Sequence, residues 1–166
     1  MLIFLFSIVV LTIVSDQITK WLALEFLKEI ETFPIIEDVL HLTYHENRGA
    51  AFGILDDNRW VFLSISTITI IGIIFYLIKY PPKSMWFGLG LAFILGGGIG
   101  NMIDRIWLGY VIDFVDFRLI NFAIFNVADS FVCIGAVLVL IFVFFCSEES
   151  KKKVKGAENE EDRTDN

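Results

Sequence analysis

Four long apolar stretches without a charged side chain limit the folds open to this sequence. They cover residues 1–15, 60–78, 85–103 and 130–146. A helix needs about 20 apolar residues to cross the ~30 Å hydrocarbon core of a bilayer. All three prolines lie outside these stretches, as helix interiors require. The sequence predicts an all-α membrane protein, a bundle of four helices spanning about residues 1–20, 60–78, 85–103 and 127–146.

Composition supports this class and excludes others. Of the 166 residues, 56% are hydrophobic, against ~45–50% in soluble globular proteins. A chain this short has too little interior to hide that much apolar surface from water. The formal net charge of −7 disfavours binding to nucleic acid. Cys133 and Cys146 both lie in the fourth stretch, which favours small buried hydrophobic residues over a disulfide or a metal site.

The ends of the chain are predicted to share one side of the membrane. The first stretch has no basic residue before it and no small-x-small cleavage site after it, so we interpret it as a retained helix. An even number of spans places both termini together, and the lysines at Lys79, Lys83 and between Lys151 and Lys155 favour the cytoplasm. Residues 1–147 are predicted to form the membrane domain, and 148–166 a charged, disordered cytoplasmic tail.

Polar side chains gather at the opposite end of the predicted bundle. Ionisable groups at membrane depth are costly, so they are candidates for function. The set comprises Asp16, Lys20, Asn47, Asn101, Asp104, Arg105, Asp113, Asn126 and Asp129. The concentration predicts a site at the outer interface. In the third span, Gly96 and Gly100 have the spacing typical of close helix packing.

Several of these residues also have a purely structural interpretation. Asp16 and Lys20 have the i,i+4 spacing of a helix ion pair. Arg105 can reach the headgroups from the end of its span. Asn126 and Asp129 have the spacing of a helix N-cap and its third residue, so Asp129 can simply favour the helix start. Both interpretations stay open for each residue.

Alternation distinguishes the two carboxylates that follow the third span. If residues 111–117 are extended, Asp113 shares a face with valines, whereas Asp116 points the other way, beside Arg118. We therefore interpret Asp116 as half of a solvated ion pair. Asp113, among apolar neighbours, should have a raised pKa, which makes it the candidate acid or base.

His41 and His45 lack the Glu of an HExxH motif, so a zinc site is not expected.

Asp113 and Asp129 together form a candidate catalytic pair. At a separation of ~4 Å, two ionised carboxylates repel by ~4 kcal/mol at an effective dielectric of 20, which corresponds to ~3 pKa units. One would hold a proton while the other stays charged. Such a pair can activate water and protonate a carbonyl or a leaving amine. Neither a GxSxG motif nor an HExxH motif offers a competing mechanism.

Five sequence blocks resemble one family, the bacterial lipoprotein signal peptidases (signal peptidase II). Order, spacing and hydropathy agree from Met1 to about Phe145, with small departures at His45, Gly98 and Ile112. The blocks are Asp16–Lys20 (DQITK), Asn47–Phe52 (NRGAAF), Gly97–Arg105 (GGIGNMIDR), Val111–Phe114 (VIDF) and Phe125–Asp129 (FNVAD).

The resemblance implies an intramembrane aspartyl endopeptidase of the bacterial cytoplasmic (inner) membrane. Such an enzyme removes signal peptides from prolipoproteins by cleaving before a diacylglyceryl-modified cysteine. The implied catalytic residues are Asp113 and Asp129. The implied supporting residues are Asp16, Lys20, Asn47, Asn101, Asp104, Arg105 and Asn126.

The resemblance also implies further features of the fold and its surroundings. It adds a small extracytoplasmic β-cradle, partly within residues 35–53, and a short periplasmic helix near residues 51–58. The expected partners are prolipoprotein substrates and membrane lipid, and the expected state is a monomer without cofactor or metal.

Two other functions use the same carboxylates. A proton-coupled membrane transporter would carry protons on Asp113 and Asp129, but it needs polar residues along a path through the whole bilayer. The inner halves of the second and fourth spans offer mainly apolar and hydroxyl side chains. A non-catalytic membrane scaffold would use the carboxylates only as caps and ion pairs.

Overall fold

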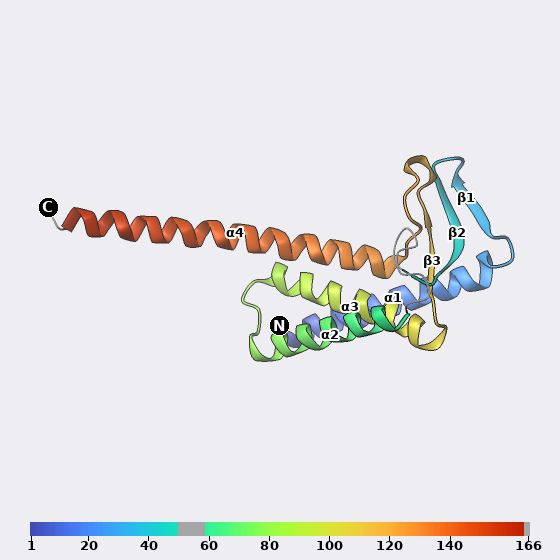
Figure 1. Ribbon diagram of the computed structural model, residues 1–166, viewed down its shortest axis with the longest axis horizontal. Coiled ribbons are helices and arrows are strands. Elements are labelled where there is room, and N and C mark those ends of the chain that lie inside the picture. The colour runs from blue at the N-terminus through green and yellow to red at the C-terminus, as the bar shows by residue number, and fades with distance from the viewer. Residues whose placement is uncertain (50–58, 165–166) are drawn as a thin grey trace.

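The computed structural model describes the backbone of residues 1–49 and 59–164, and the side chains of residues 1–49 and 60–145. The periplasmic helix expected near residues 51–58 lies outside the described residues. Within them, four helices are long and apolar enough to cross a membrane: α1 (Leu2–Leu27), α2 (Arg59–Lys79), α3 (Met85–Trp107) and α4 (Val127–Thr164). They form a bundle with a small sheet at one end (Figure 1). The four predicted spans and the helical bundle are therefore confirmed.

Two helices are longer than predicted. α1 continues seven residues beyond the predicted end at Lys20, because Ala23 and Leu27 pack against the sheet instead of marking a membrane boundary. α4 runs to Thr164, through the segment predicted to be a disordered tail. That segment contains no proline and is rich in Glu and Lys, which are good helix formers.

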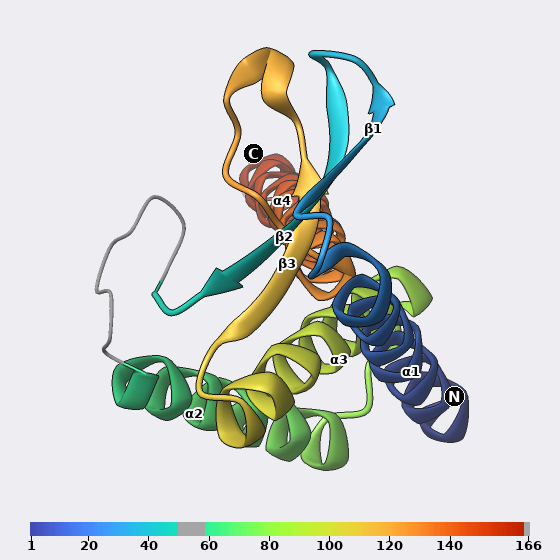
Figure 2. The same ribbon diagram turned by 90° about the vertical axis from the view of Figure 1, so that its right-hand side faces the viewer.

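α3 is the central helix of the bundle and packs against each of the other three (Figure 2). Its glycines permit the close approach: a Cβ on Gly96 would lie 2.7 Å from Cβ of Thr12 in α1. A Cβ on Gly97 would collide with the backbone carbonyl of Ala128 in α4. The close packing predicted from the spacing of Gly96 and Gly100 is thereby confirmed.

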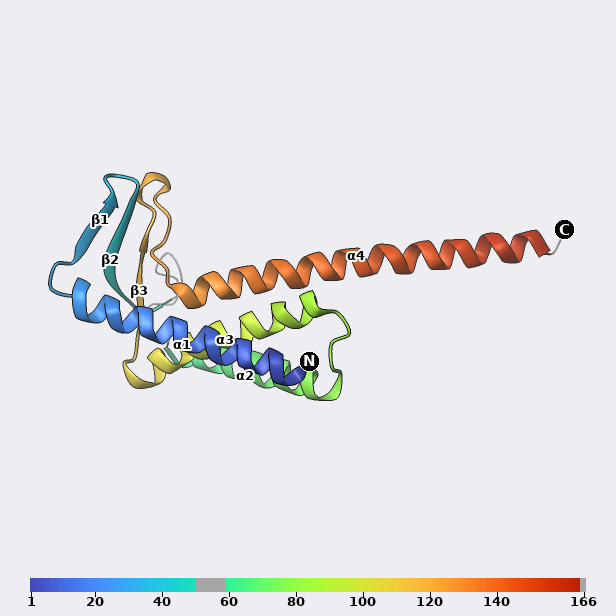
Figure 3. The same ribbon diagram turned by 180° about the vertical axis from the view of Figure 1, so that it is seen from behind.

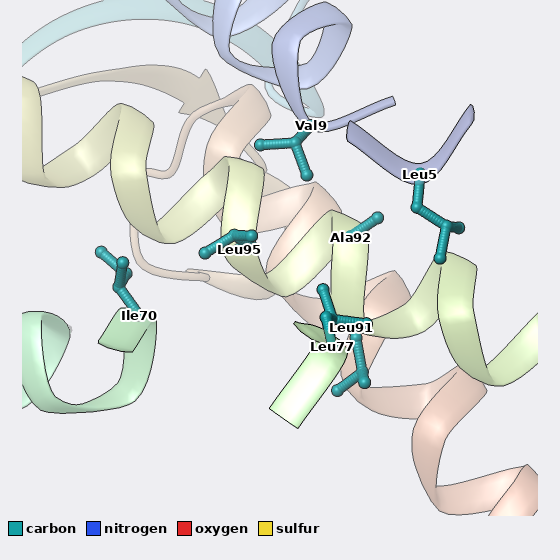
Figure 4. Packing of buried hydrophobic residues seen from close by; sticks show 7 residues of the cluster. All are labelled: Leu5, Val9, Ile70, Leu77, Leu91, Ala92 and Leu95. Carbon is teal, nitrogen blue, oxygen red and sulfur yellow. The ribbon is translucent and has the colours of Figure 1, made fainter. Parts of the chain in front are cut away.

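The hydrophobic core of the bundle fills the space between α1, α2 and α3 (Figure 4). Between helices in a bilayer, such a core is stabilised by close van der Waals packing and not by removal of apolar surface from water. Its buried members are Leu5, Val9, Ile70, Leu77, Leu91, Ala92 and Leu95.

A three-stranded antiparallel sheet lies across one end of the bundle. β1 (Thr32–Ile36) pairs with β2 (Leu40–Asn47), and β2 pairs with β3 (Val111–Asp116). The sheet begins three residues before the predicted cradle segment, and its third strand comes from the connection between α3 and α4. The N-terminus and the described end of α4 at Thr164 lie away from the sheet (Figure 3), which agrees with an even number of spans.

A second hydrophobic cluster attaches the sheet to α1. Ala23 and Leu27 of α1 pack against Ile112 and Phe114 of β3. These two β3 residues flank Asp113, so the packing fixes the strand on both sides of this carboxylate. The position of Asp113 thus depends on hydrophobic contacts that the end of α1 makes.

Candidate active site

A buried cluster of charged side chains joins α1 to α3 near the sheet. Nζ of Lys20 lies 2.9 Å from Oδ2 of Asp16, one turn earlier in the same helix, and 3.0 Å from Oδ2 of Asp104 in α3. Lys20 is only 2% exposed and Asp16 is fully buried. Buried charges are tolerated when they are paired and hydrogen-bonded. The i,i+4 ion pair predicted from the spacing is confirmed, and Asp104 is added to it.

Gln17 completes this cluster, and sequence reasoning missed it. Its Nε2 donates to Oδ2 of Asp16 at 3.2 Å and to Oδ1 of Asp104 at 3.0 Å. It also lies 3.3 Å from the carbonyl oxygen of Gly100. The only signal in the sequence was an amide directly beside Asp16, near the polar end of the first apolar stretch. An amide donor supports two carboxylates that share one cation without adding charge.

Asp16 also reaches the start of α4. Its Oδ1 accepts a hydrogen bond of 3.0 Å from the backbone N–H of Ala128, the residue before Asp129. The approach requires glycine in α3, because a Cβ on Gly100 would lie 2.5 Å from Oδ2 of Asp16. The charged cluster therefore fixes the backbone beside one candidate catalytic residue.

Asp104 makes the equivalent contact with β3. Its Oδ2 accepts a hydrogen bond of 3.1 Å from the backbone N–H of Ile112, the residue before Asp113. Asp104 and Asp16 are both bound to Lys20. One ion cluster therefore holds the backbone immediately before each of the two carboxylates.

Asp113 is fully buried between two asparagines. Nδ2 of Asn47 donates to its Oδ2 at 2.8 Å, and Nδ2 of Asn126 donates to its Oδ1 at 2.6 Å. Burial, assisted by the negative charge of nearby Asp129, raises the pKa of Asp113 from its ordinary 3.8 to about 7; the two amide donors and Lys20 oppose the rise. A raised pKa was expected from its apolar neighbours in sequence.

Asp129 occupies the third position of α4 and accepts two hydrogen bonds. Nδ2 of Asn101 donates to its Oδ1 at 2.7 Å, and the backbone N–H of Asn126 donates to its Oδ2 at 3.1 Å. In return, Oδ1 of Asn126 accepts from the backbone N–H of Asp129 at 2.9 Å. This reciprocal arrangement is a capping box. The predicted N-cap is present. Because Asn126 also donates to Asp113, the capping residue connects Asp129 with the other carboxylate.

Arg105 and Asn47 both contact Gly49, next to the carboxylates. Nη2 of Arg105 donates to the carbonyl oxygen of Gly49 at 3.3 Å, and its guanidinium lies over the ring of Phe62, 5.0 Å from the centroid. Oδ1 of Asn47 accepts from the backbone N–H of Gly49 at 3.1 Å. Arg105 thus contacts a protein carbonyl and an aromatic ring.

A cavity of about 620 Å³ opens beside Asp129. Apolar side chains of residues 122–125 form much of its wall, and Arg105, Asn47 and Ser130 add polar groups. Asp129 is partly exposed, whereas Asp113 is fully buried and reaches the cavity lining through its contact with Asn47. The cavity therefore gives an extended, largely apolar ligand access to a carboxylate.

Two predictions about neighbouring residues were wrong in part. Asp116 does pair with Arg118 at 3.0 Å, but it is not a solvated pair: Asp116 is only 8% exposed and also accepts from Oγ1 of Thr43 at 2.9 Å. The adjacent strand covers it, since His41 lies directly opposite in β2. Cys133 is exposed on α4 instead of buried, because α4 packs chiefly on one helix and leaves its other side uncovered.

Together, these features define a multi-pass membrane protein that holds two hydrogen-bonded carboxylates beside a cavity at one end of its bundle. The model of the family described as "Signal peptidase (SPase) II" matches residues 8–145. The chain belongs to this signal peptidase II family.

Relatives and solved structures agree with this assignment. The chain is 44% identical to the lipoprotein signal peptidase of Brevibacillus brevis over 88% of this chain and 98% of the relative. It is 46% identical to that of Caldanaerobacter subterraneus subsp. tengcongensis, over 83% and 94% respectively. It is also similar to a bacterial membrane enzyme solved by the in meso method at 2.3 Å resolution, with a TM-score of 0.81, 32% identity and coverage of 87% of this chain and 90% of that one.

Proposed function

We propose that this chain is an intramembrane aspartyl endopeptidase that removes signal peptides from bacterial prolipoproteins, cleaving before the diacylglyceryl-modified cysteine. The observation that carries the proposal is the pairing of Asp113 and Asp129 through Asn126, which donates its side-chain amide to one and its backbone N–H to the other. Membership of the signal peptidase II family supplies the substrate class.

The two carboxylates have different tasks in the proposed reaction. Asp113, whose pKa is raised to about 7, holds a proton near neutral pH, whereas Asp129 accepts two N–H donors and acts as the base. As water attacks the scissile carbonyl carbon, Asp129 takes a proton from the water and Asp113 gives its proton to the carbonyl oxygen. The product of this step is a neutral tetrahedral diol.

The second step restores both carboxylates. Asp129 passes its new proton to the leaving nitrogen while the C–N bond breaks, and Asp113 recovers a proton from a hydroxyl of the diol as the carbonyl re-forms. Atoms and charges balance, and no cofactor or metal takes part.

Substrate binding in this proposal uses the cavity beside Asp129. Its apolar wall suits the hydrophobic and acylated parts of a prolipoprotein, which position the scissile bond through binding energy away from it. Arg105, Asn47 and Asn101 supply the polar groups that hold the substrate backbone and the carboxylates. The enzyme acts as a monomer in the cytoplasmic (inner) membrane, with both termini in the cytoplasm and the carboxylates near the outer face.

Cleavage of a synthetic diacylglyceryl-modified precursor by the purified protein tests the proposal. Asp113→Asn and Asp129→Asn should each reduce cleavage by at least a thousandfold while the thermal unfolding of the variant in detergent stays cooperative. Asp116→Asn, which removes the other carboxylate of the same strand, should cleave normally. Retained cleavage in either of the first two variants would exclude that carboxylate from the reaction. Proton flux into liposomes that depends on both Asp113 and Asp129 would instead favour the proton-coupled transporter.

A further inference from the structure

The ammonium group of Lys20 connects the ion cluster to the carboxylate pair. An ammonium has three N–H donors and no acceptor. The three contacts of Nζ are Oδ2 of Asp16 at 2.9 Å, Oδ2 of Asp104 at 3.0 Å and Oδ1 of Asn101 at 2.8 Å. The side chain is almost completely buried. Lys20 therefore binds only acceptors, and one of them is an amide oxygen.

This contact decides which way the amide of Asn101 faces. With its oxygen on Lys20, the amide presents Nδ2 to Oδ1 of Asp129 at 2.7 Å. In the reversed orientation, the NH₂ group would face the ammonium and the carbonyl oxygen would face the carboxylate. Both contacts would then be repulsive, because each would bring like partial and full charges together. Nδ2 of Asn126 also donates to Oδ1 of Asn101, at 3.1 Å, and favours the same orientation.

We propose that Lys20 is a positioning residue for cleavage, which acts through Asn101 to keep an N–H donor on Asp129. The proposal rests on the catalytic roles of Asp129 and Asp113 given above. A hydrogen bond to the charged form of a carboxylate favours that form, which is the form of Asp129 that takes a proton from water in the proposed reaction. Without the donor, the charged form loses this support and the chemical step slows.

The effect should be on the rate of the chemical step and not on substrate binding. Lys20 lies within the bundle and does not line the cavity that we assign to substrate among the described residues. Loss of a hydrogen bond to a charged group corresponds to about a 10- to 100-fold change. We expect this reduction in kcat, with KM within twofold of the parent.

The simple variant Lys20→Met leaves Asp16 and Asp104 buried without a cation, so its failure to fold would not test the idea. The double variant Lys20→Met/Asp16→Asn keeps the net charge of the cluster, and the side-chain oxygen of Asn at position 16 still accepts from Ala128. Compared with Asp16→Asn alone, it should show the expected fall in kcat and an acid limb of the kcat profile moved to higher pH. Lys28→Met, at the exposed residue that directly follows the end of α1, is the matched control and should leave kcat unchanged.

Coupling to Asn101 provides the decisive comparison. Adding Asn101→Ala to the double variant should give the same kcat as Asn101→Ala has in the Asp16→Asn background. Lys20→Met and Asn101→Ala both remove the same donor to Asp129, so their effects should not add. Multiplicative losses, or a loss confined to KM, would overturn the proposal. Asn101→Asp in the parent keeps an acceptor for Lys20, removes the donor to Asp129 and adds a carboxylate beside it, so normal activity there would overturn the proposal as well. Active Asp113→Asn or Asp129→Asn would instead refute the proposed function.

Discussion

Nδ2 of Asn126 lies 2.6 Å from Oδ1 of Asp113, the shortest hydrogen bond between side chains of the described site. The same residue caps α4, since its Oδ1 accepts from the backbone N–H of Asp129. The oxygen is therefore engaged by the helix, which leaves only the NH₂ end to face Asp113. One asparagine thus sets the start of a membrane helix and supplies a donor to the protonated carboxyl.

The two roles of Asn126 can be separated by substitution. Asn126→Ser keeps a side-chain oxygen for the cap and removes the donor to Asp113, whereas Asn126→Ala removes both. We expect cleavage to fall about 10- to 100-fold in each variant, and only the alanine variant to lose a further ~1 kcal/mol of stability. Kinetics and thermal unfolding of both proteins check this. Equal activity of the serine variant and the parent would show that the amide donor is dispensable.

The rate of cleavage should fall on the alkaline side of about pH 7. The pKa of Asp113 is raised to about 7, first by burial and then by the charge of Asp129, and the proposed reaction needs Asp113 protonated. Above this pH, the proton is lost and kcat/KM should fall about tenfold per pH unit. A pH profile with the lipidated precursor measures it. Activity that is flat from pH 6 to 9 would contradict the assignment of the proton to Asp113.

The stability of the folded protein should also depend on pH through Asp113, and it should fall as the pH rises. The pKa of Asp113 is about 7 in the folded protein against 3.8 ordinarily. Between these values, the unfolded chain releases a proton that the folded chain retains, so stability falls as pH rises from about 4 to about 7 and then levels off. The full change is at most about 4 kcal/mol. Denaturation in detergent at several pH values should show this slope in the parent and lose it in Asp113→Asn.

Two neighbouring glycines of α3 should respond oppositely to alanine. A Cβ on Gly100 would lie 2.5 Å from Oδ2 of Asp16, so Gly100→Ala should displace the ion cluster, cost about 1–3 kcal/mol and reduce cleavage. A Cβ on Gly98 would meet only Cγ1 of Ile70, at 3.9 Å. Gly98→Ala should therefore preserve cleavage and stabilise the protein by up to ~1 kcal/mol. Unfolding and cleavage assays on the pair test this, and a harmless Gly100→Ala would mean that the helices tolerate separation.

Asp116→Asn should have little effect on cleavage despite the burial of this carboxylate. The amide oxygen of Asn can still accept from Oγ1 of Thr43, and the lost partner Arg118 is itself 40% exposed. Pairs of this partly exposed kind typically contribute no more than ~1 kcal/mol. We expect cleavage within twofold of the parent and a small fall in melting temperature. A complete loss of cleavage in a folded variant would bring Asp116 into the site.

The sequence alone determined the four spans, the helical class and the end of the bundle that carries the polar residues. These features depend on local composition, because an uncharged apolar stretch of sufficient length has few stable alternatives to a membrane helix. The alternation of residues 111–117 also singled out Asp113 before any contact was known. The sequence did not predict the full lengths of α1 and α4. Contacts with the sheet extend α1 beyond its apolar segment, and helix propensity extends α4.

Only the tertiary structure decided how the polar residues meet. Asp16 binds the backbone N–H of Ala128 across 112 positions of sequence, and Lys20 contacts Asn101 across 81. Such contacts depend on the close packing of α1, α3 and α4. The spacing of the small residues in the sequence indicates this packing, but it does not say which residues of the helices lie opposite one another. The roles of Gln17 and of the two amide orientations became visible for the same reason: a hydrogen bond is defined by the atoms on both sides of it, and the local sequence contains only one side.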